Sequence, residues 1–234
     1  MTATGEGSAV ELPFPSEEYM RLVSGNRSDD LEAHFEWVGE VLAAMLKNAE
    51  MLEPGSRLLD IGCGCGRVAR HLLDAPLAEY CGFDRHPGMI EWAQAHIAAR
   101  DDRFRFEHVD VVSVYKEVDG QAGVVPAAEF VFPWDDGTFT GALAASVFTH
   151  MDLAGTARYL RETSRVLVPG GRVWASFFLG ERTGAIEGSD WNFLTREDDA
   201  REAIEQAGLD VLRFKPPEAP SSHSWFLLEK RPPP

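Results

Sequence analysis

The hydrophobic pattern of the chain changes near residue 55. Beyond that point, short apolar runs alternate with stretches whose apolar residues recur every three or four positions, which predicts strands alternating with helices. The expected strands are residues 57–61, 79–84, 103–109, 141–147, 172–179, 209–215 and 225–230, and the expected helices are 66–74, a segment from Pro87, 153–167 and 195–208. In the last helix, Thr195 is the expected N-cap and Asp198 its capping-box partner. This alternation predicts a doubly wound α/β fold, with a mostly parallel sheet and helices on both faces.

The first 54 residues have a different pattern. Residues 29–51 carry a helical apolar face, with Ser28 as the expected N-cap and Pro54 as part of the stop signal. Residues 1–15 contain glycine, serine and two prolines, and they predict a flexible arm. We therefore divide the chain into an N-terminal arm and helical cap, residues 1–54, and a main domain, residues 55–234.

Composition narrows the class of protein. A length of 234 residues with 44% hydrophobic residues fits one large domain, with or without a helical lid. The net charge of −16 repels phosphate backbones, so nucleic acid is not the expected partner. Three cysteines, Cys63, Cys65 and Cys81, are too few for a disulfide framework and indicate a reducing cytoplasm. We expect no membrane association, because there is neither a secretory signal nor an apolar run of roughly 18–20 residues.

The clearest chemical signal is the segment Asp60-Ile61-Gly62-Cys63-Gly64-Cys65-Gly66-Arg67. An apolar strand runs directly into glycines and then into a helix, which lets the backbone approach a ligand at the end of the first strand. A dinucleotide fingerprint needs glycine at the position of Arg67, so an NAD-dependent oxidoreductase is disfavoured. Asp84 ends the second strand 22 residues beyond Gly62, where a carboxylate can accept hydrogen bonds from both hydroxyls of an adenosyl ribose. Asp110 ends the third strand in the same way.

The pattern D-x-G-x-G-x-G from Asp60 to Gly66 closely resembles motif I of the class I S-adenosylmethionine-dependent methyltransferases. Residues 132–139, 146–151 and 167–171 resemble later segments of that family in the same order, although Thr140 stands where the family often carries Asp. The resemblance covers roughly residues 55–180. It implies a Rossmann-like sheet of seven strands with the last antiparallel, S-adenosylmethionine as cofactor, and S-adenosylhomocysteine as product.

The resemblance also implies which residues bind the cofactor. Asp60 orders water or the ammonium group, Asp84 binds the ribose, and Asp110 with the backbone of Val111 binds the adenine. Arg85 and Met89 flank the adenosine. The remaining implied contacts come from the glycine loop and from the end of the fourth strand: Gly62, Cys63, Gly64, Arg67, Ser146 and Val147.

Methyl transfer from a sulfonium is an in-line displacement, so the protein must hold nucleophile, methyl carbon and sulfur in line in a dry pocket. Many acceptors must also lose a proton, which makes histidine the candidate general base. His150, just past the fourth strand, is the first candidate, although it can also serve as a packing residue beside Asp152. His223, before the final strand, is the second candidate.

Two residue pairs could be taken for metal ligands, but each has a simpler explanation. Cys63 and Cys65 lack two further zinc ligands at a fitting spacing. Asp135 and Asp136 suit a type I turn. We therefore expect no metal.

The residues that contact the acceptor can be predicted only from their expected place over the cofactor. Residues 1–54 and 180–205 are expected to cover the cofactor, with Trp191 and Phe193 in the second segment and Tyr19 and Arg21 in the first. The acidic composition favours a small-molecule acceptor, such as a secondary metabolite. Two alternatives stay open: the same fold and cofactor used for a reaction other than methylation, and a non-catalytic binding or scaffold protein. The acceptor atom and the oligomeric state are not determined by the sequence.

Overall fold

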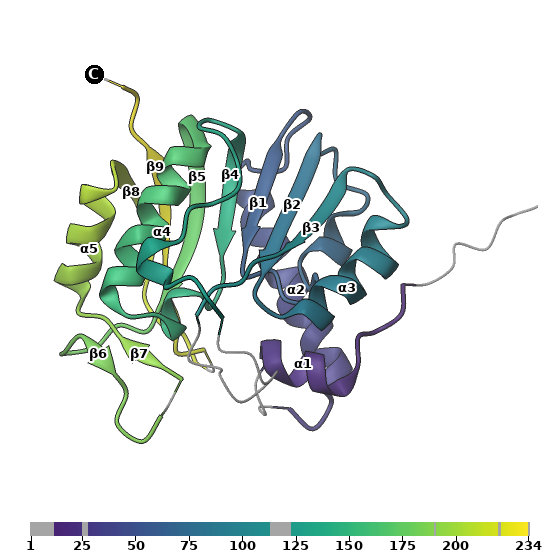
Figure 1. The fold of residues 1–234 in the computed structure, drawn as a ribbon, viewed down its shortest axis with the longest axis horizontal. Helices are drawn as coiled ribbons and strands as arrows, with labels where there is room; N and C mark the ends of the chain where they lie inside the picture. The colour runs from purple at the N-terminus through teal and green to yellow at the C-terminus, as the bar shows by residue number, and fades with distance from the viewer. Residues whose placement is uncertain (1–11, 25–27, 113–122, 190, 220, 234) are drawn as a thin grey trace, which may run out of the picture.

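The computed structural model describes residues 12–24, 28–112, 123–189, 191–219 and 221–233, and these ranges form a seven-stranded sheet flanked by helices (Figure 1). The sheet has the order β3-β2-β1-β4-β5-β9-β8. Its strands are β1 (Arg57–Ile61), β2 (Glu79–Asp84), β3 (Phe104–His108), β4 (Phe139–Ala144), β5 (Leu167–Phe177), β8 (Leu209–Lys215) and β9 (Ser224–Lys230). Strands β1 to β5 pair in parallel, whereas β9 runs antiparallel to β5 and β8. The predicted doubly wound fold with an antiparallel last strand is confirmed.

Both faces of the sheet are covered because its central strands are apolar on both sides. Successive side chains of a strand point to opposite faces. In β1, Leu59 and Ile61 therefore belong to one hydrophobic core, while Leu58 belongs to the other. All three side chains are fully buried, as expected for a strand with parallel neighbours on both sides.

Helices of both chain halves cover the two faces. The helices are α1 (Glu17–Ser24), α2 (Leu31–Asn48), α3 (Pro87–Ala93), α4 (Leu153–Val166) and α5 (Glu197–Gln206), with short helical turns η1 (Ala69–Leu72), η2 (Gln94–Ala98), η3 (Ala127–Glu129) and η4 (Phe148–His150). Helices α4 and α5 contribute to the core that contains Leu59, whereas α2 and α3 contribute to the core that contains Leu58. Across the described ranges, no helix is long and apolar enough to cross a membrane.

Helix α2 is fastened to the main sheet. The indole Nε1 of Trp174 donates to the carbonyl oxygen of Met45 at 3.2 Å, and Arg172 donates to that of Ala49 at 2.9 Å. Both donors lie on β5, and both acceptors lie at the end of α2. The bond from Arg172 satisfies a carbonyl at the helix end. The bond from Trp174 is a second one to the Met45 carbonyl, which also accepts from the Ala49 amide. A boundary between two structural parts at residue 54 stays a prediction.

Three helix starts differ from the sequence-based prediction. The cap of α2 is Asp30, which accepts from the amide of Ala33, while the Ser28 hydroxyl bonds to the backbone of Asp30. Helix α5 begins at Glu197 without a side-chain cap, so the predicted capping box is wrong. Thr195 instead exchanges backbone hydrogen bonds with residues that follow β5. The helix expected at 66–74 is reduced to turns and η1, and Gly66 itself lies outside the helical region, with a φ of +76°.

Other differences concern the edges of the fold. Helix α1 and a hairpin of β6 (Gly184–Ala185) and β7 (Phe193–Leu194) were not predicted, and β5 begins at Leu167 rather than at residue 172. Most of the predicted arm lies outside the described residues. Its described end is packed rather than flexible, because the Phe14 ring lies 6.4 Å from that of Phe35 and 4.7 Å from the guanidinium of Arg70.

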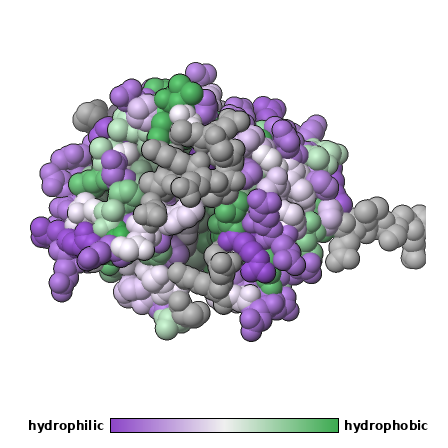
Figure 2. All heavy atoms as spheres, turned by 60° about the horizontal axis from the view of Figure 1, so that its bottom comes forward, coloured by the Kyte–Doolittle hydropathy of each residue, from purple (hydrophilic) through white to green (hydrophobic). Residues whose placement is uncertain are grey.

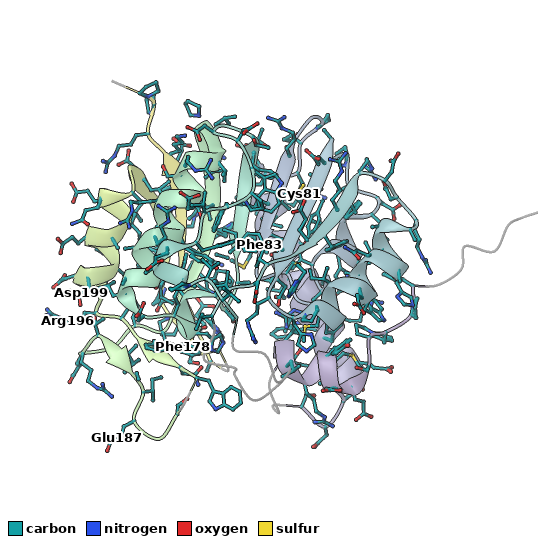
Figure 3. The ribbon with its side chains drawn as sticks, in the orientation of Figure 1. Cys81, Phe83, Phe178, Glu187, Arg196 and Asp199 are labelled. Atoms are coloured by element: carbon teal, nitrogen blue, oxygen red, sulfur yellow. The ribbon has the colours of Figure 1, made fainter. Side chains whose placement is uncertain are left out.

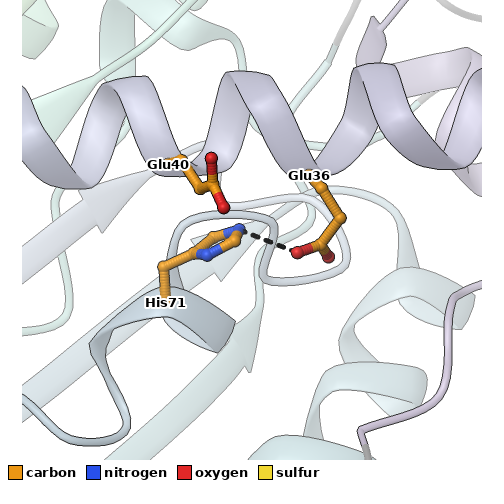
Figure 4. Close-up of side chains that lie close together, drawn as sticks. All are labelled: Glu36, Glu40 and His71. Atoms are coloured by element: carbon orange, nitrogen blue, oxygen red, sulfur yellow. Dashed lines mark ion pairs between the residues drawn. The ribbon is translucent and has the colours of Figure 1, made fainter.

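A polar cluster joins α2 to η1 (Figure 4). Glu36 Oε1 lies 2.7 Å from Arg70 Nε, and Glu36 Oε2 lies 3.7 Å from His71 Nε2. A ligand atom from each of Glu36, Glu40 and His71 lies within 4.8 Å of the others. The guanidinium of Arg70 already balances one of the two carboxylates, so we assign the cluster a structural role. The imidazole of His71 fits there because Gly39 has no side chain.

We expect Gly39→Ala to destabilise the protein by about 1–3 kcal/mol, although alanine is the better helix former. The added Cβ would lie 2.5 Å from the His71 ring and 2.7 Å from the carbonyl oxygen of Arg67, a backbone atom that cannot move aside cheaply. Urea unfolding measures the change. Ala44→Ser, at an exposed position of the same helix, should stay within about 0.5 kcal/mol of the parent. An equally stable Gly39→Ala variant would contradict this packing.

Candidate functional site

A large cleft opens at the carboxyl ends of the parallel strands. Its volume is about 1680 Å³, and its lining comes from α1, α2, the ends of β1, β2, β4 and β5, the β6–β7 hairpin and the loop between β8 and β9. In Figure 1 this is the lower edge of the sheet, between the α1–α2 side and the hairpin. Open parallel sheets bind ligands at this edge. The volume exceeds the roughly 300–1000 Å³ that is usual for one small ligand.

The glycine loop after β1 forms part of the cleft floor. The amides of Gly62 and Cys63 both donate to the carbonyl oxygen of Phe83, at 2.9 and 3.0 Å, so the loop bends over the end of β2. Gly62 has a φ of +69°, and a Cβ there would lie 2.8 Å from Val147 Cγ2. Glycine is therefore required both by the backbone conformation and by the close approach of the loop to the end of β4.

Asp84 holds the loop from the neighbouring strand. Its Oδ2 accepts from the amide of Gly64 at 2.9 Å, and its Oδ1 accepts from the amide of His86 at the same distance. Burial raises the pKa of Asp84, while these backbone donors act in the opposite direction. Each carboxylate oxygen has a further lone pair, so the group can still accept hydrogen bonds from a diol.

Asp60 is a buried carboxyl group at the end of β1. Its Oδ2 accepts from the Tyr80 hydroxyl at 2.5 Å, and only 3% of the residue is exposed. Burial raises the pKa of Asp60 to about 7, against the lowering effects of the Tyr80 hydrogen bond and of the charge of Arg67; Asp84 raises it slightly further. Ionising this buried carboxyl group is costly, and the protein's own contacts do not fully offset that cost. A cation placed in the cleft beside Asp60 would therefore stabilise the ionised form.

Arg67 connects the loop to α1. Its Nη1 donates to the carbonyl oxygen of Val23 at 2.8 Å and to the Ser24 hydroxyl at 3.3 Å, which caps the end of that helix. A Cβ at Gly64 would meet Val23 Cγ1 at 2.6 Å. Helix α1 thus lies directly on the glycine loop and closes that side of the cleft.

Ser146 follows β4 in a strained conformation. Its φ is +59°, which is uncommon for a residue other than glycine and frequent at functional sites. Its amide donates to the Ser176 hydroxyl at 2.7 Å, and its own hydroxyl lies 2.7 Å from His223 Nε2. The surrounding contacts therefore hold Ser146 in place on the cleft wall.

The two candidate bases lie in different settings. His150 Nδ1 lies 2.8 Å from the carbonyl oxygen of Trp191. A carbonyl only accepts, so Nδ1 carries the proton and Nε2 is left as the basic nitrogen. Burial lowers the pKa of His150, with the Trp191 carbonyl acting in the opposite direction, so the ring is neutral at pH 7. His223 instead lies between two hydroxyls, Ser146 Oγ on Nε2 and Ser221 Oγ at 3.2 Å from Nδ1.

The cleft brings most of the sequence-predicted residues together. Its lining includes Asp60, Gly62, Cys63, Arg67, Asp84, Arg85, Met89, Val111, Ser146, Val147, His150 and His223. Gly64 and Asp110 are not among the lining residues: Val23 covers Gly64, and the side chain of Asp110 is exposed. The roles of all these residues stay predictions. Of the lid residues, Arg21, Trp191 and Phe193 line the cleft, whereas the Tyr19 ring packs against His86 at 5.2 Å.

Sequence reasoning missed several residues of the site. Tyr80 gave no signal, because an aromatic residue at the start of a strand suggests only core packing. Ser176 lies inside β5, and only the pairing of β4 with β5 brings it beside Ser146. Within residues 1–54, which were expected to cover the cofactor, the face of α2 with Trp37 and Val41 was not singled out. Which side of α2 faces the cleft and which side faces the core depends on how the helix packs on the sheet.

A seven-stranded α/β sheet with this cleft defines the class I fold of S-adenosylmethionine-dependent methyltransferases. The sequence matches the family described as "Methyltransferase domain" over residues 59–175. The chain belongs to this family, whose cofactor is S-adenosylmethionine, as the sequence motifs predicted.

Curated relatives of this chain include two methyltransferases with different named substrates. A malonyl-[acyl-carrier protein] O-methyltransferase of Hahella chejuensis is 30% identical over 134 residues, which are 56% of this chain and 39% of the relative. A 27-O-demethylrifamycin SV methyltransferase of Amycolatopsis mediterranei is 30% identical over 153 residues, which are 64% of this chain and 49% of the relative. The chain thus matches less than half the length of these relatives.

Solved structures show the same fold at low identity. A 1,6-didemethyltoxoflavin-N1-methyltransferase of Burkholderia thailandensis, with bound 1,6-didemethyltoxoflavin and S-adenosylhomocysteine, has a TM-score of 0.63 at 19% identity, covering 95% of this chain and 94% of that one. The [4+2]-cyclase SpnF has a TM-score of 0.65 at 18% identity, covering 88% of this chain and 83% of that one. The second similarity illustrates that the fold alone does not determine the reaction.

Replacing Asp60 by Asn should change how the free energy of unfolding depends on pH. The pKa of Asp60 is raised from 3.8 to about 7 on folding, so the native state holds the proton more tightly. The wild type therefore loses stability as pH rises from about 4 to about 7, and no further loss comes from this group above that window. The variant lacks this loss, so it should gain on the order of 4 kcal/mol relative to wild type across the window.

Urea unfolding at several pH values measures this difference, to which titrating groups distant from Asp60 contribute equally in both proteins. Asp198→Asn, which replaces an exposed carboxylate, should show no such trend. A constant difference between wild type and Asp60→Asn from pH 4 to pH 8 would contradict the assigned burial cost.

Proposed function

We propose that the protein transfers the methyl group of S-adenosylmethionine to a small-molecule acceptor by in-line displacement. The observation that carries this proposal is the convergence of Asp60, the glycine loop and Asp84 on one cleft that is large enough for two ligands. Family membership supports the cofactor, and the relatives named above support an acceptor of secondary metabolism. The net charge of −16 continues to disfavour nucleic acid as the acceptor.

The residues present fit the cofactor. The buried carboxyl group of Asp60 suits the ammonium of the methionine part, and Asp84 has lone pairs for the two ribose hydroxyls. Gly62 leaves its part of the floor free of side-chain atoms. When bound, S-adenosylmethionine supplies a methyl carbon on a positively charged sulfur, whose C–S bond breaks as the bond to the acceptor forms.

His150 is proposed as the general base. With its Nδ1 proton held by the Trp191 carbonyl, its Nε2 takes the proton of an acceptor hydroxyl as the new bond to carbon forms. From an acceptor ammonium it takes the proton first, so that the nitrogen lone pair is available for the displacement. His223 is proposed to position Ser146 through the 2.7 Å contact rather than to take the proton, because both its ring nitrogens already face hydroxyls. Orientation of the reactants in a dry cleft supplies the larger share of the acceleration.

Cofactor binding is tested by thermal unfolding with S-adenosylhomocysteine and, separately, with NAD. At 100-fold excess over the dissociation constant, a ligand stabilises the native state by about 2.7 kcal/mol, which raises Tm by roughly 5–10 °C for a chain of this size. We expect this rise with S-adenosylhomocysteine only. Asp84→Asn should remove most of the rise, whereas Asp135→Asn, at an exposed turn, should retain it. A rise with NAD instead would refute the assignment.

The role of His150 is tested by replacing it with Asn. We expect kcat to fall by about 10²–10⁴, the usual contribution of a general base, with unchanged affinity for S-adenosylhomocysteine. The activity remaining in the variant should also lose the low-pH limb of the pH profile. Release of S-adenosylhomocysteine measures turnover, and a mass gain of one CH₂ on the acceptor separates methylation from another reaction. His96→Asn, outside the cleft, is the matched control.

A His150→Asn variant with wild-type kcat would leave His150 with a packing role. A wild-type protein that binds the cofactor but never releases product would favour a scaffold protein.

A further inference from the structure

Beyond the residues proposed to hold the cofactor, the cleft continues along an apolar wall. We define the apolar wall as Trp37, Val41 and Met45 of α2, Phe178 after β5, Trp191 beside the β6–β7 hairpin and Trp225 of β9. These residues come from four segments that are far apart in sequence. Figure 2 looks onto this side of the molecule and shows hydrophobic atoms in the hollow between hydrophilic borders.

Part of the apolar wall is open to water. Trp37 is 53% exposed and Val41 is 39% exposed, and the two lie four residues apart, on the same face of α2. Large apolar side chains that line a cleft and remain exposed mark a binding surface more often than a structural one. Removing this surface from water would favour binding of an apolar ligand.

The apolar wall contains no charged residue, although the chain as a whole carries a net charge of −16. Lys215 at the end of β8 and Glu218 in the loop that follows also line the cleft, and their charges are opposite. The wall therefore offers a charged acceptor little compensation for lost hydration. Three of its six members are tryptophans, whose flat faces favour stacking against rings.

The apolar wall also reaches the groups proposed to act in catalysis. The ring of His223 lies 4.7 Å from that of Phe178 and 6.3 Å from that of Trp225, and its Nε2 contacts Ser146. On the other side, the Trp191 carbonyl contacts His150. Phe178 lies at the lower end of β5, where the sheet faces the hairpin (Figure 3). A molecule seated on the wall would thus lie beside both the end of β4 and His150.

We propose that the apolar wall is the acceptor subsite and that it selects a bulky, uncharged, ring-containing molecule whose reacting hydroxyl points toward His150. This inference rests on the proposed function for the identity of the reaction, but the subsite itself is defined by its own residues. The cleft volume of about 1680 Å³ leaves space for such a molecule beside a cofactor. The exposed Trp37 and Val41 form the outer part of the subsite, and Phe178 and Trp225 form its inner part.

The test uses the neutral fluorescent probe N-phenyl-1-naphthylamine, titrated into the full chain with and without saturating S-adenosylhomocysteine. The variants are Trp37→Ala and Val41→Asp, both at exposed positions where folding should be unaffected. Val131→Asp is the matched control, because Val131 is a valine with 56% exposure that does not line the cleft. Affinity for S-adenosylhomocysteine is measured separately for every protein by titration calorimetry.

We expect the wild type to bind the probe while it is saturated with S-adenosylhomocysteine. Val41→Asp should weaken probe binding by about tenfold or more and Trp37→Ala by a similar factor, because one adds a charge to the subsite and the other removes its largest exposed surface. Val131→Asp should match the wild type, and no variant should change affinity for S-adenosylhomocysteine.

Three results would overturn the subsite: no probe binding by the cofactor-loaded protein, equal binding by wild type and Val41→Asp, or equal weakening by Val131→Asp. Failure of S-adenosylhomocysteine to bind the wild type would instead refute the proposed function. Since probe binding is recorded without the cofactor as well, the two failures are distinguishable.

Discussion

The close approach of the glycine loop to the ends of β2 and β4 is the constraint on which the rest of the cleft depends. The loop is pinned by two amides on the Phe83 carbonyl and by the Gly64 amide on Asp84. A side chain at Gly62 would clash with Val147, so the loop can lie this close to the end of β4 only because Gly62 has no side chain. Because the loop lies low, Asp60 and Asp84 come to line the same cavity, and α1 can rest on the loop through Val23.

The cofactor end of the cleft is costly for the protein to maintain. Asp60 keeps a buried carboxyl group with one hydroxyl partner, and Ser146 keeps a positive φ. Neither feature is needed to build a parallel sheet. An apolar residue in place of Asp60 would remove the buried carboxyl group, and glycine in place of Ser146 would remove the backbone strain. Such local costs are expected where binding, rather than folding, has determined the residue. The two costs lie at the ends of β1 and β4, which are neighbouring strands, so both residues line the same part of the cleft.

The acceptor end is assembled differently. Its apolar residues are contributed by α2, by the end of β5, by the hairpin and by β9, and the sheet order brings these segments together because β9 lies next to β5. The same hairpin supplies the carbonyl that fixes the His150 tautomer. In the proposed function, contact with the acceptor and orientation of the base would therefore both depend on this one short segment.

The order of strands and helices followed from the sequence, because strand and helix periodicity are local properties of the chain. The antiparallel last strand and most of the residues at the cofactor end followed from the resemblance to the methyltransferase family, which rests on the local motif from Asp60 to Gly66 and on Asp84. Helix starts were less certain: Ser28 and Asp30 are both good caps, and only the seating of α2 selects Asp30. Only the tertiary structure decided the partners that are distant in sequence: Tyr80 on Asp60, Ser176 and His223 on Ser146, and the Trp191 carbonyl on His150. These contacts are set by strand register and by the packing of loops across the sheet edge. No periodicity within a single segment encodes these contacts, so they could not be predicted from the sequence.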